Sequence, residues 1–267
     1  MHRFWPLLLL IAACSDDEEL TPLQLNQRER DDVVGGMRGT TYRTARGAVP
    51  EGTLSVEGRD YTAEDQGLTI ATAFLLARQK RLALYEIERT TPRNRAAEYH
   101  ILRGFIYMAW KWPHLAEQEF LAVQPPGEAR VTRAMTHFGL AAFHLNQKEP
   151  DRAAEQIALA DDLIGASPLG KVLLAMAAAQ KGDDARAKEL WRSAADAGGL
   201  SPEAKEFLQK HGDKMDLSLI EDHPEIVLLL GAASMTDKES LEPLRPLYEK
   251  TKTWCDETAR KLKSEGE

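Results

Sequence analysis

The sequence predicts an all-α fold: a solenoid of about four helix–turn–helix repeats, with C-terminal capping helices and a disordered N-terminal tether. Three observations lead to this prediction. Apolar residues recur at spacings of three and four from Thr62 onward, the periodicity of amphipathic helices. Small residues recur about every 34 residues along the same region. Strand-forming runs are scarce, and aromatic residues make up 7% of the 267 residues.

The overall charge and the cysteine content exclude several classes of protein. The 34 Lys and Arg against 42 Asp and Glu give a net charge of −8. We therefore expect no nucleic-acid partner, because no basic excess is available to replace phosphate counterions. Two cysteines exclude a disulfide-rich scaffold. No apolar run reaches the length of about 18 residues that a membrane-spanning helix needs.

The N-terminus has the form of a secretory signal peptide covering residues 1–13. A short positive start precedes residues 4–13, which are apolar apart from Pro6. This stretch ends Leu-Ile-Ala-Ala before Cys14, and in this it resembles the lipobox of bacterial lipoproteins. An ordinary signal sequence, or a buried N-terminal helix with an incidental cysteine, is the alternative.

The lipobox resemblance implies a lipid anchor. In that family the cysteine thiol takes a diacylglyceryl group, the chain is cut before it, and the new amine is acylated, so Cys14 would carry the lipid. The residue after the cysteine sorts such proteins between membranes. Ser15 at that position implies the periplasmic face of the outer membrane, with the inner membrane as the alternative because Asp16 follows. Cys255 would then be a buried thiol or an intermolecular cross-link.

Residues 14–61 are predicted to be a lipid-anchored flexible linker. Residues 15–32 contain seven acidic residues and two arginines with little apolar content, which favours a self-repelling, disordered segment. The glycine-rich stretch 33–60 contains two β-prone segments, 40–44 and 53–57, that either pair as a short hairpin or remain extended.

Residues 62–199 are predicted to form the helix pairs. Thr62 followed by Asp65 is typical of a capping box at a helix start. Two marks then repeat with one period. One is a small residue followed four and seven residues later by further packing residues, starting at Ala83, Ala116, Ala153 and Ala187. The other is a small residue in each preceding helix, at Ala71, Gly104, Gly139 and Ala175.

This pattern resembles the tetratricopeptide repeat, a helix–turn–helix of 34 residues. Residues 182–194 carry the resemblance best: a glycine–aspartate turn, then Ala187 for a close helix approach and Trp191 to fill the space between repeats. The stretch from Asn146 to Asp151 departs from the pattern and is predicted to make a longer turn. Another helical-repeat solenoid or a non-repetitive bundle remains the alternative.

Residues 200–267 are predicted to be a C-terminal helical cap, which a repeat array needs to cover its last apolar face. Ser201 and Pro202 indicate the start of its first helix. Residues 224–236 and 239–263 are predicted to form two more helices.

The sequence contains no recognisable catalytic motif. A nucleophile elbow, a zinc-type histidine pair and a Walker loop are all missing from it. His137 and His144 are seven residues apart, two helical turns, which is too far for joint metal ligation. We therefore expect no enzyme activity, no cofactor, no metal and no small-molecule substrate.

The repeat resemblance implies that the first helix of each pair lines a concave groove. Projection from the small residue of each first helix selects an apolar set that is predicted to bind a protein: Leu68, Leu75, Ile101, Phe105, Met108, Leu140, Phe143, Val172 and Met176. An exposed apolar face of this kind marks a binding site. The alternative is that the C-terminal helices or the first segment fold back and bury it.

These predictions together indicate a membrane-anchored protein-binding scaffold or assembly adaptor of the bacterial cell envelope. Its partner would be another envelope protein or a peptide segment, and the lipid anchor would hold it at the membrane. The architecture is similar to that of pilotins, small outer-membrane lipoproteins that escort secretin subunits, by analogy only. An envelope enzyme with an unrecognised site and a structural spacer are the alternatives.

Overall fold

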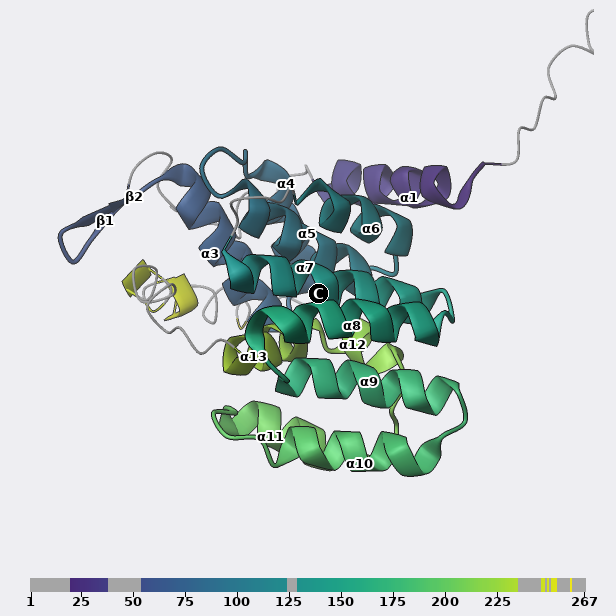
Figure 1. Cartoon of the computed structure of the whole chain (residues 1–267). Helices are drawn as coiled ribbons and strands as arrows, with labels where there is room; N and C mark the ends of the chain where they lie inside the picture. Colours follow the sequence, from purple (N-terminus) through teal and green to yellow (C-terminus); the bar gives the residue numbers. More distant parts are fainter. Residues whose placement is uncertain are drawn as a thin grey trace, which may run out of the picture.

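The computed structural model describes residues 20–37, 54–123 and 129–234, together with the helical residues 246, 247, 249, 251–253 and 260. Within these residues the fold is all-α apart from one two-stranded hairpin, so the all-α part of the predicted fold class is confirmed (Figure 1). The elements in chain order are α1 (Pro22–Met37), β1 (Leu54–Val56), β2 (Arg59–Tyr61), α3 (Ala63–Leu76), α4 (Lys80–Arg89), α5 (Ala96–Ala109), α6 (Pro113–Ala122), α7 (Arg130–Asn146), α8 (Pro150–Ile164), α9 (Pro168–Gln180), α10 (Asp184–Ala195), α11 (Pro202–Lys210), α12 (Ser218–Asp222) and α13 (Pro224–Ser234).

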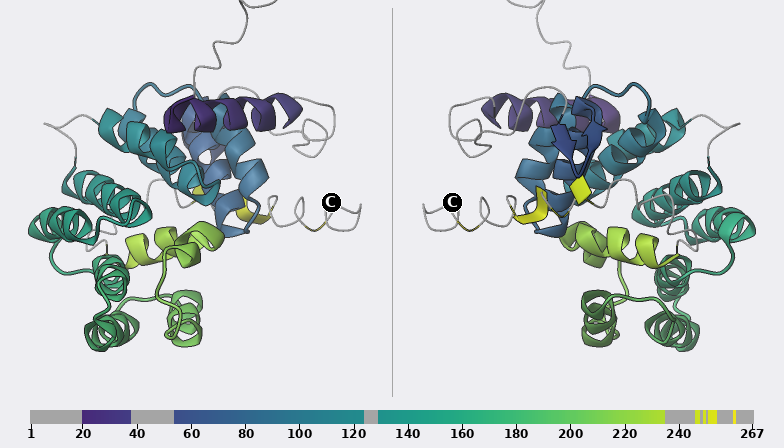
Figure 2. Two further views of the ribbon diagram at one scale, coloured as in Figure 1. Left: turned by 90° about the vertical axis from the view of Figure 1, so that its right-hand side faces the viewer. Right: turned by 90° about the vertical axis from the view of Figure 1, so that its left-hand side faces the viewer.

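Helices α3 to α10 form four successive pairs: α3 with α4, α5 with α6, α7 with α8, and α9 with α10. Each pair also packs against the next, because α4 contacts α5, α6 contacts α7 and α8 contacts α9. The first helices of neighbouring pairs contact one another as well. They therefore line one side of the stack, and the stack curves around that side (Figure 2).

The turns within the four pairs have the same length and the same backbone conformation. Each turn contains one residue with positive φ: Arg78 (61°), Lys111 (62°), Lys148 (58°) and Gly182 (78°). The amide after it donates to a carbonyl five residues back in the first helix, as in Gln79 to Phe74 at 2.8 Å and Asp183 to Ala178 at 3.0 Å. The longer turn predicted between Asn146 and Asp151 is wrong, because Gln147, Lys148 and Glu149 repeat this same geometry.

The small residues that recur in the sequence lie in buried contacts between helices. Ala83, Ala116, Ala153 and Ala187 of the second helices are fully buried. In the first helices, a Cβ added at Gly104 or Gly139 would lie 2.5 Å or 2.4 Å from the ring of Phe120. The Phe120 ring thus fills a space that exists only because both neighbouring positions are glycine.

The burial of Ala187 leads to a first prediction. Replacement of Ala187 by leucine should lower the free energy of unfolding by about 1–3 kcal/mol, because the larger side chain overpacks a close helix contact. Lys188 is exposed on the same helix, and leucine there should have an effect within about 0.5 kcal/mol. Thermal or urea unfolding of the two variants measures the difference. Equal effects would place Ala187 outside a tight contact.

The N-terminal region differs from the predicted flexible linker. Residues Pro22–Met37 form α1, which packs against α4 and α6 and buries Met37. Specific contacts hold it: Trp112 Nε1 donates to Glu29 at 3.0 Å, and the His114 amide donates to Asn26 at 3.3 Å. Residues 22–37 are therefore helical despite their charged composition, because distant groups of the helix array form hydrogen bonds with their polar side chains.

A hairpin is present, with a pairing different from the predicted one. Residues Leu54–Val56 pair antiparallel with Arg59–Tyr61 across a turn in which Glu57 and Gly58 have positive φ. The predicted partner segment, residues 40–44, lies outside the described residues. So do the signal peptide, Cys14 and Cys255.

The chain beyond α10 first extends the stack and then turns back. Helix α11 begins at the predicted Ser201 cap and packs on α10, where Trp191 Nε1 donates to the Leu208 carbonyl at 2.7 Å. Helices α12 and α13 then return to the first helices, with α12 on α5 and α13 on α3, α5 and α9. In both views of Figure 2, α13 lies inside the curve of the stack. Most of the predicted third cap helix, 239–263, lies outside the described residues.

Candidate functional site

The structure places the nine predicted groove residues in the interior. Leu140 is half-buried, and the other eight are at most 9% exposed. The apolar face is therefore covered, and it is not an open surface in this conformation. Of the two arrangements that the sequence left open, the structure has the one in which C-terminal helices fold back over this face.

Two of the nine residues face a second helix. The Phe105 ring packs edge-on against Phe120 of α6, with 5.2 Å between ring centroids. The Phe143 ring packs in the same way against His114, also a residue of α6, with 5.8 Å between ring centroids. Phe105 therefore belongs to the packing within the α5–α6 pair, and Phe143 belongs to the packing between α6 and α7 of neighbouring pairs. Truncating either side chain would destabilise the array. They are not suitable probes of partner binding.

Helix α13 covers the inner face with an apolar surface of its own. Ile226, Val227 and Leu230 are at most 4% exposed. Gly231 lies against Met135 of α7, where an added Cβ would come within 2.9 Å of the methionine methyl carbon. The inner face thus holds a short helix across the first helices of all four pairs.

The polar edge of this contact joins two carboxylates to the turns of the helix pairs. Glu221 of α12 lies 3.6 Å from Lys111 Nζ and accepts a hydrogen bond from Asn146 at 3.1 Å. Glu225 of α13 accepts from Arg78 Nε at 2.8 Å. Arg78 and Lys111 are the positive-φ residues of the first two turns. The carboxylates are four residues apart, and they bind cations in the turns of two successive helix pairs.

Glu225 lies in an incompletely paired environment. Its side chain is 4% exposed, and its Oε1 atom contacts both Arg78 and His223, the latter at 3.2 Å. Its Oε2 atom is buried without a hydrogen-bond partner. His223 and His211 both pack on the Phe207 ring. Burial and the neighbouring His223 lower the pKa of His211.

A second polar cluster connects α4, α5 and α6 on the outer side. Arg103 bridges Glu88 and Glu119 at 3.1 Å each, and Tyr107 donates to Glu88 at 2.5 Å. Burial raises the pKa of Tyr107, and the Glu88 carboxylate raises it further. Every charge in this cluster has a close opposite partner, so the cluster joins helix pairs and offers no free acid or base.

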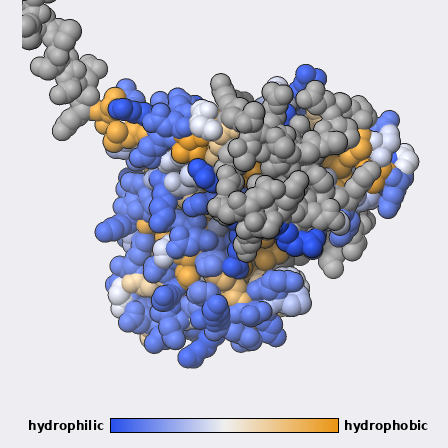
Figure 3. Space-filling view, turned by 180° about the vertical axis from the view of Figure 1, so that it is seen from behind, coloured by the Kyte–Doolittle hydropathy of each residue, from blue (hydrophilic) through white to orange (hydrophobic). Residues whose placement is uncertain are grey.

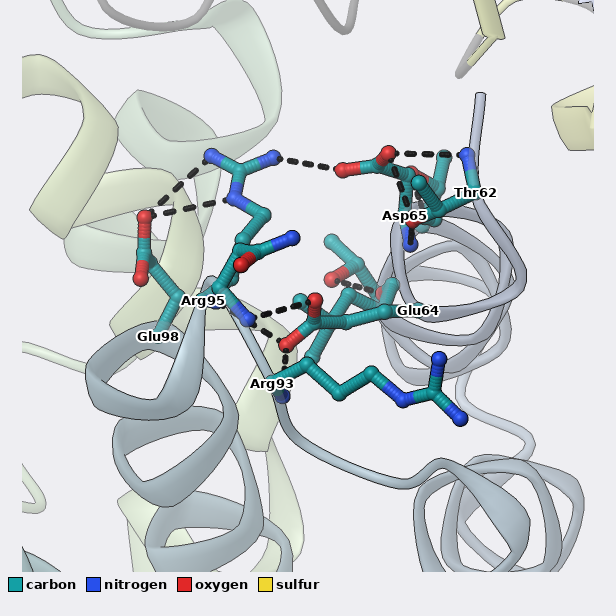
Figure 4. Close-up of polar contacts among 10 residues, drawn as sticks. Thr62, Glu64, Asp65, Arg93, Arg95 and Glu98 are labelled. Atoms are coloured by element: carbon teal, nitrogen blue, oxygen red, sulfur yellow. Dashed lines mark hydrogen bonds and ion pairs between the residues drawn. The ribbon is translucent and has the colours of Figure 1, made fainter. Parts of the chain in front are cut away.

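A third polar contact joins the first two helix pairs (Figure 4). The buried Glu64 carboxylate of α3 accepts the backbone amides of Arg93, Asn94 and Arg95, at 2.7, 3.0 and 2.9 Å. Burial acts to raise the pKa of Glu64, but these three hydrogen bonds outweigh it and lower the pKa. The contact fixes the loop that leads into α5. Its geometry is that of a structural clamp.

The other candidates from the sequence have separate roles. His137 and His144 bind different partners, Gln156 and Glu149. In the part of the chain that the structure describes, no group of three or more His, Cys, Asp or Glu side chains is placed to hold a metal ion. Over the same residues, no helix has both the length and the apolar character to cross a bilayer.

Glu221, Glu225 and the apolar residues that follow them were not predicted from the sequence to form one binding segment. The available signal was an acidic pair four residues apart, followed by five consecutive Ile, Val and Leu residues at 226–230. The candidate site is therefore the inner face of the helix array with α12–α13 bound on it. No known protein family, curated protein or solved structure matches the chain.

Proposed function

We propose that this protein is a membrane-anchored, protein-binding scaffold of the bacterial cell envelope. The observation that supports the proposal most directly is that the inner face of the helix array binds a helical segment, α12–α13, through an apolar surface and a charged edge. A surface with that chemistry suits a helical segment of another protein.

The proposal includes a repeat solenoid similar to the tetratricopeptide repeat. The four turns with positive φ support it, because they recur at intervals of 33, 37 and 34 residues. Buried small residues at matching positions of successive pairs support it as well. In a solenoid of this kind each unit packs only on its neighbours, so the array presents an extended inner surface for binding.

The lipid anchor is proposed from the resemblance of residues 10–14 to a lipobox. Acylation at Cys14 would hold the scaffold at the periplasmic face of the outer membrane. More than one acyl chain gives durable attachment, whereas a single chain is marginal. The partner is another envelope protein or a peptide segment of one.

The Cys14→Ser variant tests the anchor, because serine lacks the thiol that accepts the lipid. We expect the wild-type chain to incorporate radiolabelled palmitate and to fractionate with membranes. The variant should incorporate none and accumulate as an uncleaved or mislocalised precursor. The distant Cys255→Ser variant is the matched control and should label normally. Equal labelling of wild type and Cys14→Ser would exclude the anchor.

A cross-linking experiment tests the scaffold. The wild-type chain is cross-linked in intact cells, extracted in detergent and analysed by mass spectrometry, with a background sample that lacks cross-linker. We expect one dominant envelope protein, and we expect that protein, once purified, to bind the chain with a measurable Kd. If no protein exceeds the background, the scaffold function is excluded.

A further inference from the structure

The inner face has the features of a binding site with an occupant from the same chain. The apolar contact alone does not distinguish a bound segment from an ordinary core helix. The difference lies in the edge, where two acidic side chains of α12–α13, Glu221 and Glu225, reach residues of the turns within the helix pairs. These turns have one geometry throughout the array. The occupant therefore binds a feature that the repeats would present in its absence.

The ion pairs at this edge bind α12–α13 only weakly to the array. The side chains of Arg78 and Lys111 are 63% and 62% exposed, although the carboxylates that they bind are nearly buried. Because the two cations are largely in solvent, water and dissolved salt screen these ion pairs. Release of α12–α13 would leave two exposed cations free to bind another carboxylate pair.

The fit of the occupant is also incomplete. The Oε2 atom of Glu225 is buried and lacks a hydrogen-bond partner, and a buried acceptor without a partner is destabilising relative to a satisfied one. The segment is interrupted as well, because α12 ends at Asp222 and α13 begins at Pro224. A continuous helix that placed both carboxylates without this penalty would bind the same face better.

We propose that α12–α13 is an internal occupant of the partner-binding face. The partner presents a helix of the same chemistry: two carboxylates four residues apart, followed by a run of Ile, Val or Leu. This inference rests on the proposed scaffold function and names the ligand of its inner face. Since the occupant is part of the same chain, it competes at a high effective concentration. The apparent affinity for the partner is reduced by the fraction of chains in which the face is open.

The test uses the full-length chain and a fluorescein-labelled peptide with the sequence of residues 216–234. Fluorescence anisotropy measures the Kd. The double variant Glu221→Gln with Glu225→Gln, called the occupant variant, is designed to weaken the binding of α12–α13 to the inner face. It changes no residue of α3–α10. We expect it to bind the peptide at least tenfold more tightly than wild type. The matched control is Glu206→Gln, an exposed acidic residue of α11, which should bind like wild type.

Two further substitutions test whether the charged edge of the inner face recognises the peptide. When Arg78→Gln and Lys111→Gln are added to the occupant variant, we expect the tenfold gain to be lost. A peptide with both glutamates replaced by glutamine should also lose affinity. Hydrogen exchange should show faster exchange in α13 of the occupant variant and unchanged protection in α3–α10.

Three outcomes would overturn the inference. The first is that the peptide binds wild type and variant with equal affinity, or binds neither of them. The second is that the occupant variant loses protection from hydrogen exchange throughout α3–α10, which would make α13 an integral part of the core. The third is that the occupant variant forms a dimer that exchanges α12–α13 between copies, which would make a second copy the ligand. In each case the cross-linking test of the scaffold function remains valid, because a partner can bind elsewhere on the array.

Discussion

Replacement of Phe120 by alanine is expected to lower the free energy of unfolding by about 3–5 kcal/mol. The ring is fully buried between Gly104 of α5 and Gly139 of α7, and it packs edge-on against Phe105. Glycine at both positions leaves no nearby Cβ to fill the space that the ring vacates, so the cavity would be large. Urea unfolding monitored by circular dichroism measures the loss.

The neighbouring Leu121 provides the control, because its side chain is 63% exposed on the same helix. Leu121→Ala should change the free energy of unfolding by less than about 0.5 kcal/mol. Gly139→Ala should be destabilising on its own and less so in a Phe120→Leu background, which has room for the added methyl group. Additive effects of those two substitutions would show that the ring does not occupy the space opposite Gly139.

Replacement of Glu64 by glutamine is expected to lower the free energy of unfolding by about 2–3 kcal/mol near pH 7. The charged carboxylate accepts three backbone amides at the entry to α5, and hydrogen bonds to charged groups contribute about 1.5–3 kcal/mol each. The neutral amide retains part of this bonding, so the net loss is smaller than the sum. Alanine should cost more than glutamine.

The effect of Glu64 should depend on pH in a defined direction. Its pKa in the folded state is lowered, so its contribution is fully present above the pKa of an unfolded glutamate, about 4.3. The contribution is lost as the pH falls through the lower folded-state pKa. The stability difference between wild type and Glu64→Gln should therefore shrink on acidification. The control Glu98→Gln removes an exposed charge beside the same Arg95 and should lower the free energy of unfolding by less than about 1 kcal/mol at pH 7.

The sequence was sufficient to predict the elements that depend on local spacing. The Thr62–Asp65 capping box, the Ser201 cap and the buried alanines of the second helices are as predicted. Each of these features involves residues within a few helical turns of one another. Periodicity reports which face of a helix is apolar, and that part of the prediction is confirmed.

The site could not be predicted, because it depends on contacts between distant segments. Periodicity does not say what covers an apolar face, so Val172 and Met176 had the same pattern whether they lined a groove or a core. Helix α13, which covers this face, begins more than forty residues after the end of α9. The Glu64 clamp joins positions 29–31 residues apart, and α1 binds residues more than 80 positions away. Projection by helical spacing also placed Phe105 and Phe143 on the inner side, whereas both rings contact side chains of α6.

The docking of α1 would set the distance between the helix array and a membrane that holds the proposed lipid anchor at Cys14. A flexible tether of 48 residues would allow a root-mean-square reach of about 35–40 Å and free rotation of the array. With α1 held on α4 and α6, only six peptide units separate the proposed anchor at Cys14 from Leu20, a span of at most about 20–22 Å.

The start of α1 also presents apolar surface, coloured orange at the upper left of Figure 3. Leu20 and Leu25 are 39% and 46% exposed there. This end of the molecule would face the lipid head groups, and the array would be oriented with respect to the bilayer plane. A partner would then be met at a fixed height and angle above the membrane surface.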